Sequence, residues 1–431
     1  MKLRFFVAPF VALTLALPTF ALNFPVQKLV HFETQANAVA KRSEQPVLLP
    51  HVEIPVEFVG VDFAKTLDPK IATALVIEKK GKKYVRWILN PEDTKWGKEL
   101  IESARGAGLD LKVEHYFVGY QTASRSYIAE DPKTGIQFSV KSSTDKTGGH
   151  WRDKKQPVGE AIDGRLLNDF LVEQNSKRAF ENFIFMEEPA ILKIPSIDQA
   201  VVIRDLGPLK FESNTHIYLP GFSALHDSVG AEIALKNGSR DPYAFWTEHY
   251  IKLAGKALGE LAGRTGLQFD SPHSQNFLVE LDSNYKPTGR LVLRDLSDLY
   301  VDQSFIEALE GKNSKTLKEF TQKQNLSPSI QAGFGPLHGN EKPSWVSEKH
   351  YSIWKNVFFK SFETSFEKST GYDLAALNVA KEQNGDYFGA NYQLSKKAEF
   401  KNFYQSMRKL GVVRNFKLPA RCERLFSASG F

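Results

Sequence analysis

Cysteine is almost missing from this sequence, which has Cys422 and no other among its 431 residues. A single cysteine cannot form an internal disulfide or a cysteine-rich zinc site, and its position far from the N-terminus excludes a lipoprotein anchor. The ten histidines form no HExxH motif. We therefore expect no structural metal and no metalloprotease chemistry.

The glycine-rich phosphate-binding motifs are missing as well. Neither GxxxxGK[ST] nor GxGxxG occurs, so a P-loop and a dinucleotide-binding fold have no support, and the lack of GxSxG argues against a serine hydrolase. After residue 21, no stretch approaches the ~20 uninterrupted apolar residues that a membrane-spanning helix needs. We expect no membrane span in the processed chain.

Positive charge is only mildly in excess. The formal net charge is +6, and the lysines gather in short clusters such as Lys79–Lys83 and Lys154–Lys155. Clusters of this kind are usually solvated faces, whereas nucleic-acid binding calls for stronger, patterned basicity with interleaved aromatic residues. We expect no nucleic-acid partner.

A signal peptide is predicted for residues 1–21. A basic start precedes the apolar run Phe5–Ala21, which ends in Thr19–Ala21, a pattern that suits signal-peptidase cleavage. The alternative is a membrane anchor, but the run is short for a bilayer span and contains Pro9 and Pro18. The chain is therefore expected to be periplasmic or secreted.

The rest of the chain divides into a tether and two lobes. Residues 22–55 are rich in small or polar residues and prolines and are predicted to be a linker. Residues 56–205 mix strand and helix patterns, including a hairpin whose strands are 126–129 and 136–141. Residues 206–431 show mainly helical patterning. The sequence predicts an α+β fold, with an antiparallel-sheet lobe followed by a mainly helical C-terminal lobe.

The strongest chemical signal is a catalytic-type loop, 266–276, followed by a predicted hairpin, 277–295. The loop presents His273 and Asn276 just before a strand pair that returns Asp295 to the same end of the sheet. Phosphate chemistry needs donors for phosphate oxygens, and an Asn and an Asp to hold Mg²⁺. Protein kinases and aminoglycoside kinases use this order of parts. The loop and hairpin therefore predict a nucleotide site.

Each of these residues also has an ordinary structural interpretation. His273 could cap a turn, and Asp295 could pair with Arg294 at the surface. Their joint presence in this order favours function, with Gln275 and Asn276 as nucleotide contacts and Asn276 and Asp295 as metal ligands.

Upstream residues could complete a phosphate-binding lobe. Lys141 ends a predicted strand, where its amine could reach phosphates, and Glu160 could orient that lysine from the start of a helix. For the basic residues, a role as plain surface charges stays open. The other candidate contacts are Ser124, Arg125, Ser126 and Arg152.

Several segments in a fixed order resemble the NRPS-independent siderophore synthetases of the aerobactin-synthetase type. In chain order they are Phe245–Tyr250, the helix that continues to Gly263, Gly266, His273–Asn276 and Arg294–Asp295. The segment Ser124–Ser126, together with Lys141 and Arg152, is similar in order and spacing to the Ser/Arg, Lys and Arg positions of that family. The resemblance covers residues 116–305.

The resemblance implies an enzyme that uses ATP and Mg²⁺ to adenylate a carboxylate, typically of citrate or a citrate derivative, and passes the acyl group to an amine or alcohol. It implies that Lys141, Arg152, His273 and Asn276 contact ATP phosphates or stabilise the developing charge. Asn276 and Asp295 would hold the metal. On this hypothesis the catalytic residues are Lys141, His273 and Asp295.

The sequence also departs from the family pattern. Ser271 and Pro272 precede His273 where the family has Glu before an Ala-His pair, and Leu296–Asp298 replaces the usual glycines after Arg-Asp. The chain is shorter than a full synthetase. An export signal also conflicts with a need for plentiful ATP.

Three functions are compatible with these observations. The first is an ATP-dependent ligase, or a kinase-like phosphotransferase, that meets ATP outside its own cytoplasm. The second is a catalytically degenerate relative that binds a nucleotide or another anion without turnover. The third is an unrelated structural or envelope-associated protein. The joint presence of Lys141, His273, Asn276 and Asp295 favours the first two, and the departures favour the second of these.

Overall fold

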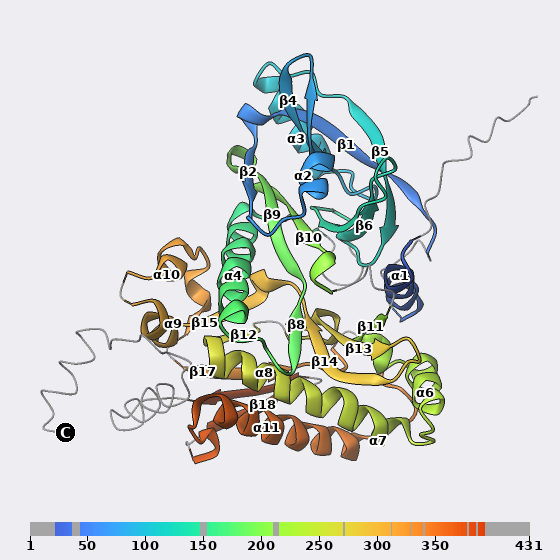
Figure 1. Cartoon of the computed structure of the whole chain (residues 1–431), viewed down its shortest axis with the longest axis vertical. Helices are drawn as coiled ribbons and strands as arrows, with labels where there is room; N and C mark the ends of the chain where they lie inside the picture. Colours follow the sequence, from blue (N-terminus) through green and yellow to red (C-terminus); the bar gives the residue numbers. More distant parts are fainter. Residues whose placement is uncertain are drawn as a thin grey trace, which may run out of the picture.

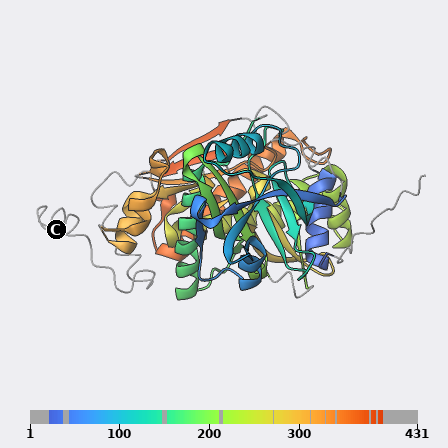
Figure 2. The ribbon, with the colours of Figure 1, turned by 90° about the horizontal axis from the view of Figure 1, so that it is seen from above.

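The fold is taken from a computed structural model that describes residues 22–36, 44–146, 153–209, 215–269, 272–311, 313–327, 329–338, 341–376, 379–384 and 387–392. An upper part is built on one large curled sheet, and a lower part layers helices with smaller sheets (Figure 1). The view from above shows the strands and helices of the two parts packed over one another (Figure 2). Within these residues, no helix has the length and apolarity to cross a membrane. The predicted signal peptide lies outside them.

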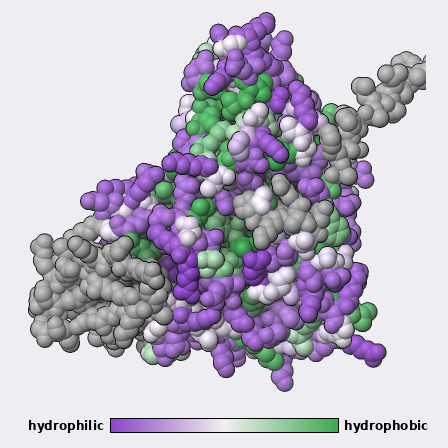
Figure 3. All heavy atoms as spheres, in the orientation of Figure 1, coloured by the Kyte–Doolittle hydropathy of each residue, from purple (hydrophilic) through white to green (hydrophobic). Residues whose placement is uncertain are grey.

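A nine-stranded sheet of antiparallel pairs forms the upper part. In sheet order its described strands are β2 (Gly60–Phe63), β9 (Glu187–Ile194), β10 (Gln199–Asp205), β7 (Gln137–Lys141), β6 (Ser126–Glu130), β5 (Val113–Gln121), β1 (Val47–Pro55), β4 (Lys82–Ile88) and β3 (Val76–Lys79). The predicted hairpin is confirmed as β6 and β7, with Ser126 opposite Lys141. Figure 3 shows hydrophobic side chains gathered over the strands β1, β2 and β4, within a mostly hydrophilic face.

The sequence predicts a linker at 22–55, but where the structure describes this segment it contains a helix and a strand. The helix α1 (Phe24–Ala36) buries apolar side chains such as Val26 and Leu29, and β1 lies inside the large sheet between β4 and β5. The linker was predicted because prolines within this segment, such as Pro50, are typical of irregular chain. Pro50 lies at an irregularity in the pairing of β1 with β5, and strands tolerate proline at such positions.

The lower part contains three smaller sheets among its described residues. The first joins β11 (His216–Pro220), β13 (Phe277–Asp282), β14 (Pro287–Leu293) and β8 (Phe183–Phe185); the second joins β12 (Leu267–Phe269), β15 (Leu299–Asp302) and β16 (Leu326–Ser327); the third joins β17 (Ile330–Phe334), β19 (Tyr387–Tyr392) and β18 (Val379–Asn384). The predicted hairpin 277–295 is confirmed as β13 and β14. An α+β fold is therefore observed, as the sequence predicts.

The helices join and cover these sheets. Besides α1, they are α2 (Pro69–Leu75), α3 (Trp96–Gly106), α4 (Val158–Lys177), α5 (Gly221–Ala224), α6 (Asp227–Lys236), α7 (Pro242–Trp246), α8 (Lys252–Thr265), α9 (Gln303–Glu310), α10 (Lys315–Glu319) and α11 (Glu348–Thr370). The helix α4 links the two parts: Asn168 accepts a hydrogen bond from the Glu188 backbone at 2.8 Å, and Asp163 accepts one from the Thr321 backbone at 2.6 Å. These bonds set the upper sheet against the lower part, where the predicted site residues meet.

The long helices α8 and α11 lie against each other at the base of the molecule (Figure 1). Glycines at every fourth position of α8 allow this close approach. A Cβ atom added at Gly255 would lie 2.4 Å from the Phe358 carbonyl oxygen, and one at Gly259 would lie 2.3 Å from the Phe362 carbonyl oxygen. The glycines therefore let one helix backbone rest directly on the other.

Candidate functional site

An ion cluster with two buried cations centres on Asp295, a partly exposed residue just after β14. Lys141 at the end of β7 donates to the Asp295 carboxylate, and Arg204 Nη2 of β10 lies 2.9 Å from the same oxygen, Oδ1. Lys141 is adjacent to Arg204 because β7 and β10 are paired, with Val202 opposite Lys141. Burial alone would raise the pKa of Asp295, but the charges of Lys141 and Arg204 outweigh burial and hold that pKa well below its usual range. Asp295 is therefore ionised at neutral pH.

Arg204 also bridges to a second carboxylate. Its Nε lies 2.8 Å from Glu188 Oε1 of β9, and both side chains are buried. Because Glu188 is fixed to α4 through its backbone bond to Asn168, the guanidinium has little freedom. Arg204 therefore holds Asp295 from a rigid position.

Asp298 lies one short turn after Asp295. Asn276 Nδ2 is 3.4 Å from Asp298 Oδ2, which is long for a hydrogen bond. Burial first, and then the negative charge of Asp295, raise the pKa of Asp298 to about 7. Asn276 and Asp298 thus lie beside Asp295, which brings one amide and two carboxylates to one place.

The raised pKa of Asp298 predicts a pH effect on stability. A carboxyl whose pKa is higher in the folded state contributes stability below its unfolded pKa, near 3.8, and this contribution is lost as pH rises through about 7. Asp298→Asn removes that loss, because the amide does not titrate. Urea denaturation at about pH 5 and about pH 8 should show the variant gaining relative to wild type at the higher pH. A difference that stays constant with pH would contradict the raised pKa.

The loop before β13 is folded around His273. The Gln275 N–H donates to His273 Nδ1 at 3.2 Å, and the Asn276 N–H donates to the His273 carbonyl at 3.0 Å. Burial lowers the pKa of His273 to about 4, so the ring is neutral at pH 7. Since Nδ1 accepts, this hydrogen bond assigns the ring proton to Nε2, which can act as a donor. A neighbouring loop supports this turn, because Gly335 donates its N–H to the Pro272 carbonyl at 2.8 Å.

Two further cationic side chains, Arg125 and Lys154, lie near the ion cluster. Arg125 Nη1 donates to Gln156 Oε1 at 3.2 Å and to the Lys155 carbonyl at 3.2 Å. Burial lowers the pKa of Lys154, as do the charges of Arg125 and Lys141, while Asp298 and Asp295 raise it. Lys154 therefore lies among these groups. We call Arg125, Lys141, Lys154 and Arg204 the cationic cluster.

Arg294 does not pair with Asp295, although the adjacent positions allow that interpretation. Its Nη1 lies 2.5 Å from Glu33 Oε1, and Glu33 is fully buried on α1. Its Nε donates to the Gln275 carbonyl at 2.7 Å. Arg294 thus connects α1 to the loop of His273. The partners of Asp295 are Lys141 and Arg204 of the cationic cluster.

The remaining predicted site residues do not pair with Asp295 in the described part of the chain. Ser126 is buried opposite Lys141, and the Ser124 carbonyl accepts from Asn90 at 2.9 Å. The sequence predicts that Glu160 orients Lys141, but the structure gives the two residues different partners. Gln156 Nε2 lies 3.4 Å from Glu160 Oε2, and Lys141 pairs with Asp295. Arg152 lies outside the described residues.

Three site residues escaped the sequence analysis. Lys154 belonged to a pair interpreted as surface charge, Arg204 ended a strand with no motif around it, and Asp298 was counted only as a departure from the family pattern. A charged residue at the end of a strongly apolar strand, as in Arg204, was the one available signal.

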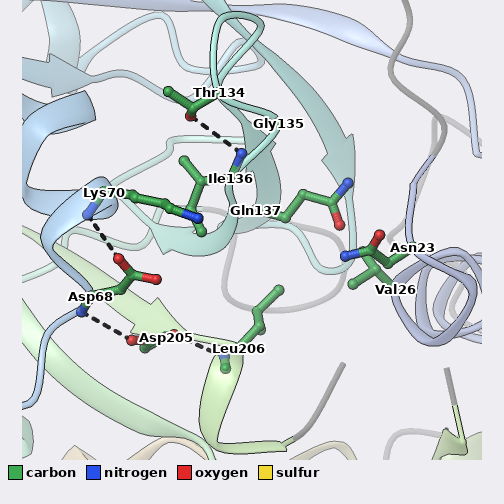
Figure 4. Close-up of a pocket in the computed structure, with 11 residues that line it drawn as sticks. Asn23, Val26, Asp68, Lys70, Thr134, Gly135, Ile136, Gln137, Asp205 and Leu206 are labelled. Atoms are coloured by element: carbon green, nitrogen blue, oxygen red, sulfur yellow. Dashed lines mark hydrogen bonds between the residues drawn. The ribbon is translucent and has the colours of Figure 1, made fainter. Parts of the chain in front are cut away.

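A polar cavity of about 320 Å³ adjoins the site. Asp68, Lys70, Gln137 and Asp205 line it together with Val26 of α1, and Figure 4 shows them around the open space. Asp205 Oδ2 accepts from the Asp68 backbone at 3.3 Å. Its neighbour Arg204 pairs instead with Glu188 and Asp295. No member of the cationic cluster lines the cavity, so it is a separate space.

Solved structures match this architecture at low sequence identity. The petrobactin biosynthesis protein AsbB from Bacillus anthracis str. Sterne gives a TM-score of 0.55 at 12% identity, over 88% of this chain and 72% of that one. The ATP-bound aerobactin synthetase IucA from a hypervirulent pathotype of Klebsiella pneumoniae gives 0.52 at 14% identity, over 86% and 69%. The chain has the fold of the siderophore synthetases.

The chain spans about two thirds of the length of the synthetases it matches. In two further superpositions the chain spans 65% of aerobactin synthetase IucC and 62% of IucA from the same pathotype. No protein-family model and no curated protein sequence matches it. The resemblance stated from the sequence motifs is therefore confirmed at the level of the fold.

Proposed function

We propose that the chain binds ATP together with Mg²⁺ and uses it in an ATP-dependent ligation that activates a carboxylate. The observation that carries this proposal is the convergence of Lys141 of β7, Arg204 of β10 and Asp295, which follows β14, beside the loop of His273 and Asn276. The ATP-bound synthetase of the same fold supports it.

The cationic cluster suits a polyphosphate. Of its four cations, Arg204 is neutralised by Glu188, and Lys141 by Asp295. Lys154 is partly desolvated beside like charges, which lowers its pKa, so an anion placed there would be stabilised. Arg125 is held by neutral acceptors and keeps its charge for a ligand. The Nε2–H of His273 adds a neutral donor.

The oxygens of Asn276, Asp295 and Asp298 fit Mg²⁺, which prefers hard oxygen ligands and usually takes only one or two from the protein. A cation held between Asp295 and Asp298 would offset the repulsion between the two carboxylates, which together with burial raises the pKa of Asp298. When bound, the ion would neutralise phosphate charge. Phosphates that draw Lys141 away from Asp295 would free that carboxylate for the metal, so nucleotide and metal binding should depend on each other.

Binding without turnover is the second candidate. Asp295 is already held by two cations, and a metal must compete with both. Pyrophosphate release with ATP, Mg²⁺, citrate and an amine separates the two, because a binder shows a nucleotide response but releases none.

Thermal shift of the purified protein with ATP, ADP, AMP or citrate, each with and without Mg²⁺, tests nucleotide binding. Ligand at about a hundred times its Kd adds roughly 2.7 kcal/mol to stability. We expect a rise specific for nucleotides and larger with Mg²⁺. If none of the nucleotides raises the melting temperature, the proposed function is wrong.

The proposed location, periplasmic or secreted, has its own test. The helix α1 begins at Phe24 and carries the buried Glu33 that binds Arg294, so cleavage after Ala21 would leave this helix and this ion pair in the mature chain. N-terminal sequencing of protein from the cell envelope should begin near Leu22. Intact Met1 in a cytosolic fraction would contradict export, and would place the chain where ATP is plentiful.

A further inference from the structure

A second group of possible ligands lies on the large sheet, on strands β1 and β5. His51 and Glu53 are two residues apart on β1 and so share a face, and Glu114 of β5 is the cross-strand partner of His51. One ligand atom from each of the three lies within 4.8 Å of the others. No sequence motif indicates this group, because β-sheet pairing brings Glu114 to the other two.

His51 is the unusual member of the group. Its side chain is 1% exposed, and neither ring nitrogen forms a hydrogen bond within the described part of the chain. Nε2 points toward the carboxylates, 3.9 Å from Glu53 Oε1, while the ring packs edge-on against Tyr116 and Phe117. A buried polar group left without a partner costs about 1–3 kcal/mol. A ligand that bonds to this nitrogen would remove that cost.

The ammonium group of Lys79 lies beside the carboxylates of Glu53 and Glu114. The Lys79 ammonium donates to Glu53 Oε2 and lies 4.0 Å from Glu114 Oε2, yet its side chain is 48% exposed and can turn into solvent. Arg86 lies farther off, with Nε 3.8 Å from Glu53 Oε1, and is anchored by stacking on Tyr116 at 3.7 Å. Lys79 is therefore the exchangeable cation of the two.

We propose that His51, Glu53 and Glu114 bind a divalent transition-metal ion of the Zn²⁺ type, and that Lys79 occupies its place when the ion is absent. One imidazole and two carboxylates are ligands that Zn²⁺ accepts, leaving a fourth position for water, whereas Mg²⁺ and Ca²⁺ prefer oxygen alone. Burial lowers the pKa of His51 to about 4, so the ring is free of a second proton at neutral pH. Arg86 makes the site weaker than a closed structural zinc site.

Isothermal titration of the intact protein with Zn²⁺, without nucleotide, tests the proposal. Glu114→Gln alters a half-exposed ligand and should weaken one binding event at least tenfold. Lys79→Met removes the competing ammonium and should strengthen the same event several-fold. The matched control Glu102→Gln changes an exposed carboxylate on α3 and should leave binding unchanged, and wild type should bind Mg²⁺ far more weakly at this site.

The two variants predict opposite shifts, which a general loss of folding cannot produce. Zn²⁺ binding that is the same in wild type and Glu114→Gln, or that Lys79→Met weakens, would overturn the proposal. Because no nucleotide is present and none of the three ligands belongs to the cationic cluster, the result is independent of the proposed ATP site.

Discussion

Asp295→Asn is expected to abolish the gain in ATP affinity that Mg²⁺ brings, while ATP binding in EDTA becomes tighter. The first effect follows because the amide loses the charge that would hold the ion. The second follows because Lys141 and Arg204 lose their carboxylate partner and remain free for phosphate. Isothermal titration with ATP, at matched Mg²⁺ and in EDTA, measures both effects.

The same variant should lose stability without ligand. Breaking a buried ion pair by removing one partner costs about 3–5 kcal/mol, although Arg204 keeps its bond to Glu188. Glu248→Gln is the matched control, since it changes one exposed carboxylate of an i,i+4 pair with Lys252. If Asp295→Asn is destabilised but responds to Mg²⁺ as wild type does, the aspartate is structural, and the enzyme hypothesis loses its main support.

A companion variant tests the phosphate side of the site. Lys141→Ala should weaken ATP binding at least tenfold, about 1.4 kcal/mol, both with Mg²⁺ and in EDTA. The ligand-free protein should also be less stable, because the structure buries Lys141 against Asp295, whereas the sequence alone suggests an unpaired lysine. Lys252→Ala, on an exposed helix face, is the control. Unchanged ATP affinity in Lys141→Ala would exclude the cationic cluster as the phosphate site.

Gly259→Ala is expected to lower the free energy of unfolding by about 1–3 kcal/mol, the usual effect of overpacking a close contact. The added Cβ would meet the Phe362 carbonyl oxygen at 2.3 Å, and this obstacle is the backbone of α11, which cannot turn aside as a side chain can. The two helices would have to separate along their whole contact.

Urea denaturation measures this effect, and Gly106→Ala on α3 is the matched control. A Cβ at Gly106 meets no atom within 4 Å, so alanine there should leave stability unchanged or raise it slightly through helix propensity. Equal shifts in the two variants would show that α8 and α11 do not depend on a bare backbone at Gly259.

The sequence identified those parts of the site that depend on local patterns. Strand alternation and turn residues placed Lys141 at the end of one hairpin and Asp295 at the end of another, and the structure brings the two together across 154 positions. The sequence did not predict that segments 22–36 and 47–55 form a helix and a strand. Their apolar residues are scattered among prolines and polar residues, so only their burial against distant strands shows that they are folded.

By itself, then, the sequence determined the α+β class, the order of the motifs and the two hairpins, because these depend on residues close together in the chain. Only the tertiary structure decided which charges meet. In the structure, Asp295 forms ion pairs with Lys141 and Arg204. Its neighbour Arg294 binds Glu33 of α1 instead. The physical reason is that ion pairing and pKa values depend on distance and burial in space, which residue spacing along the chain does not specify.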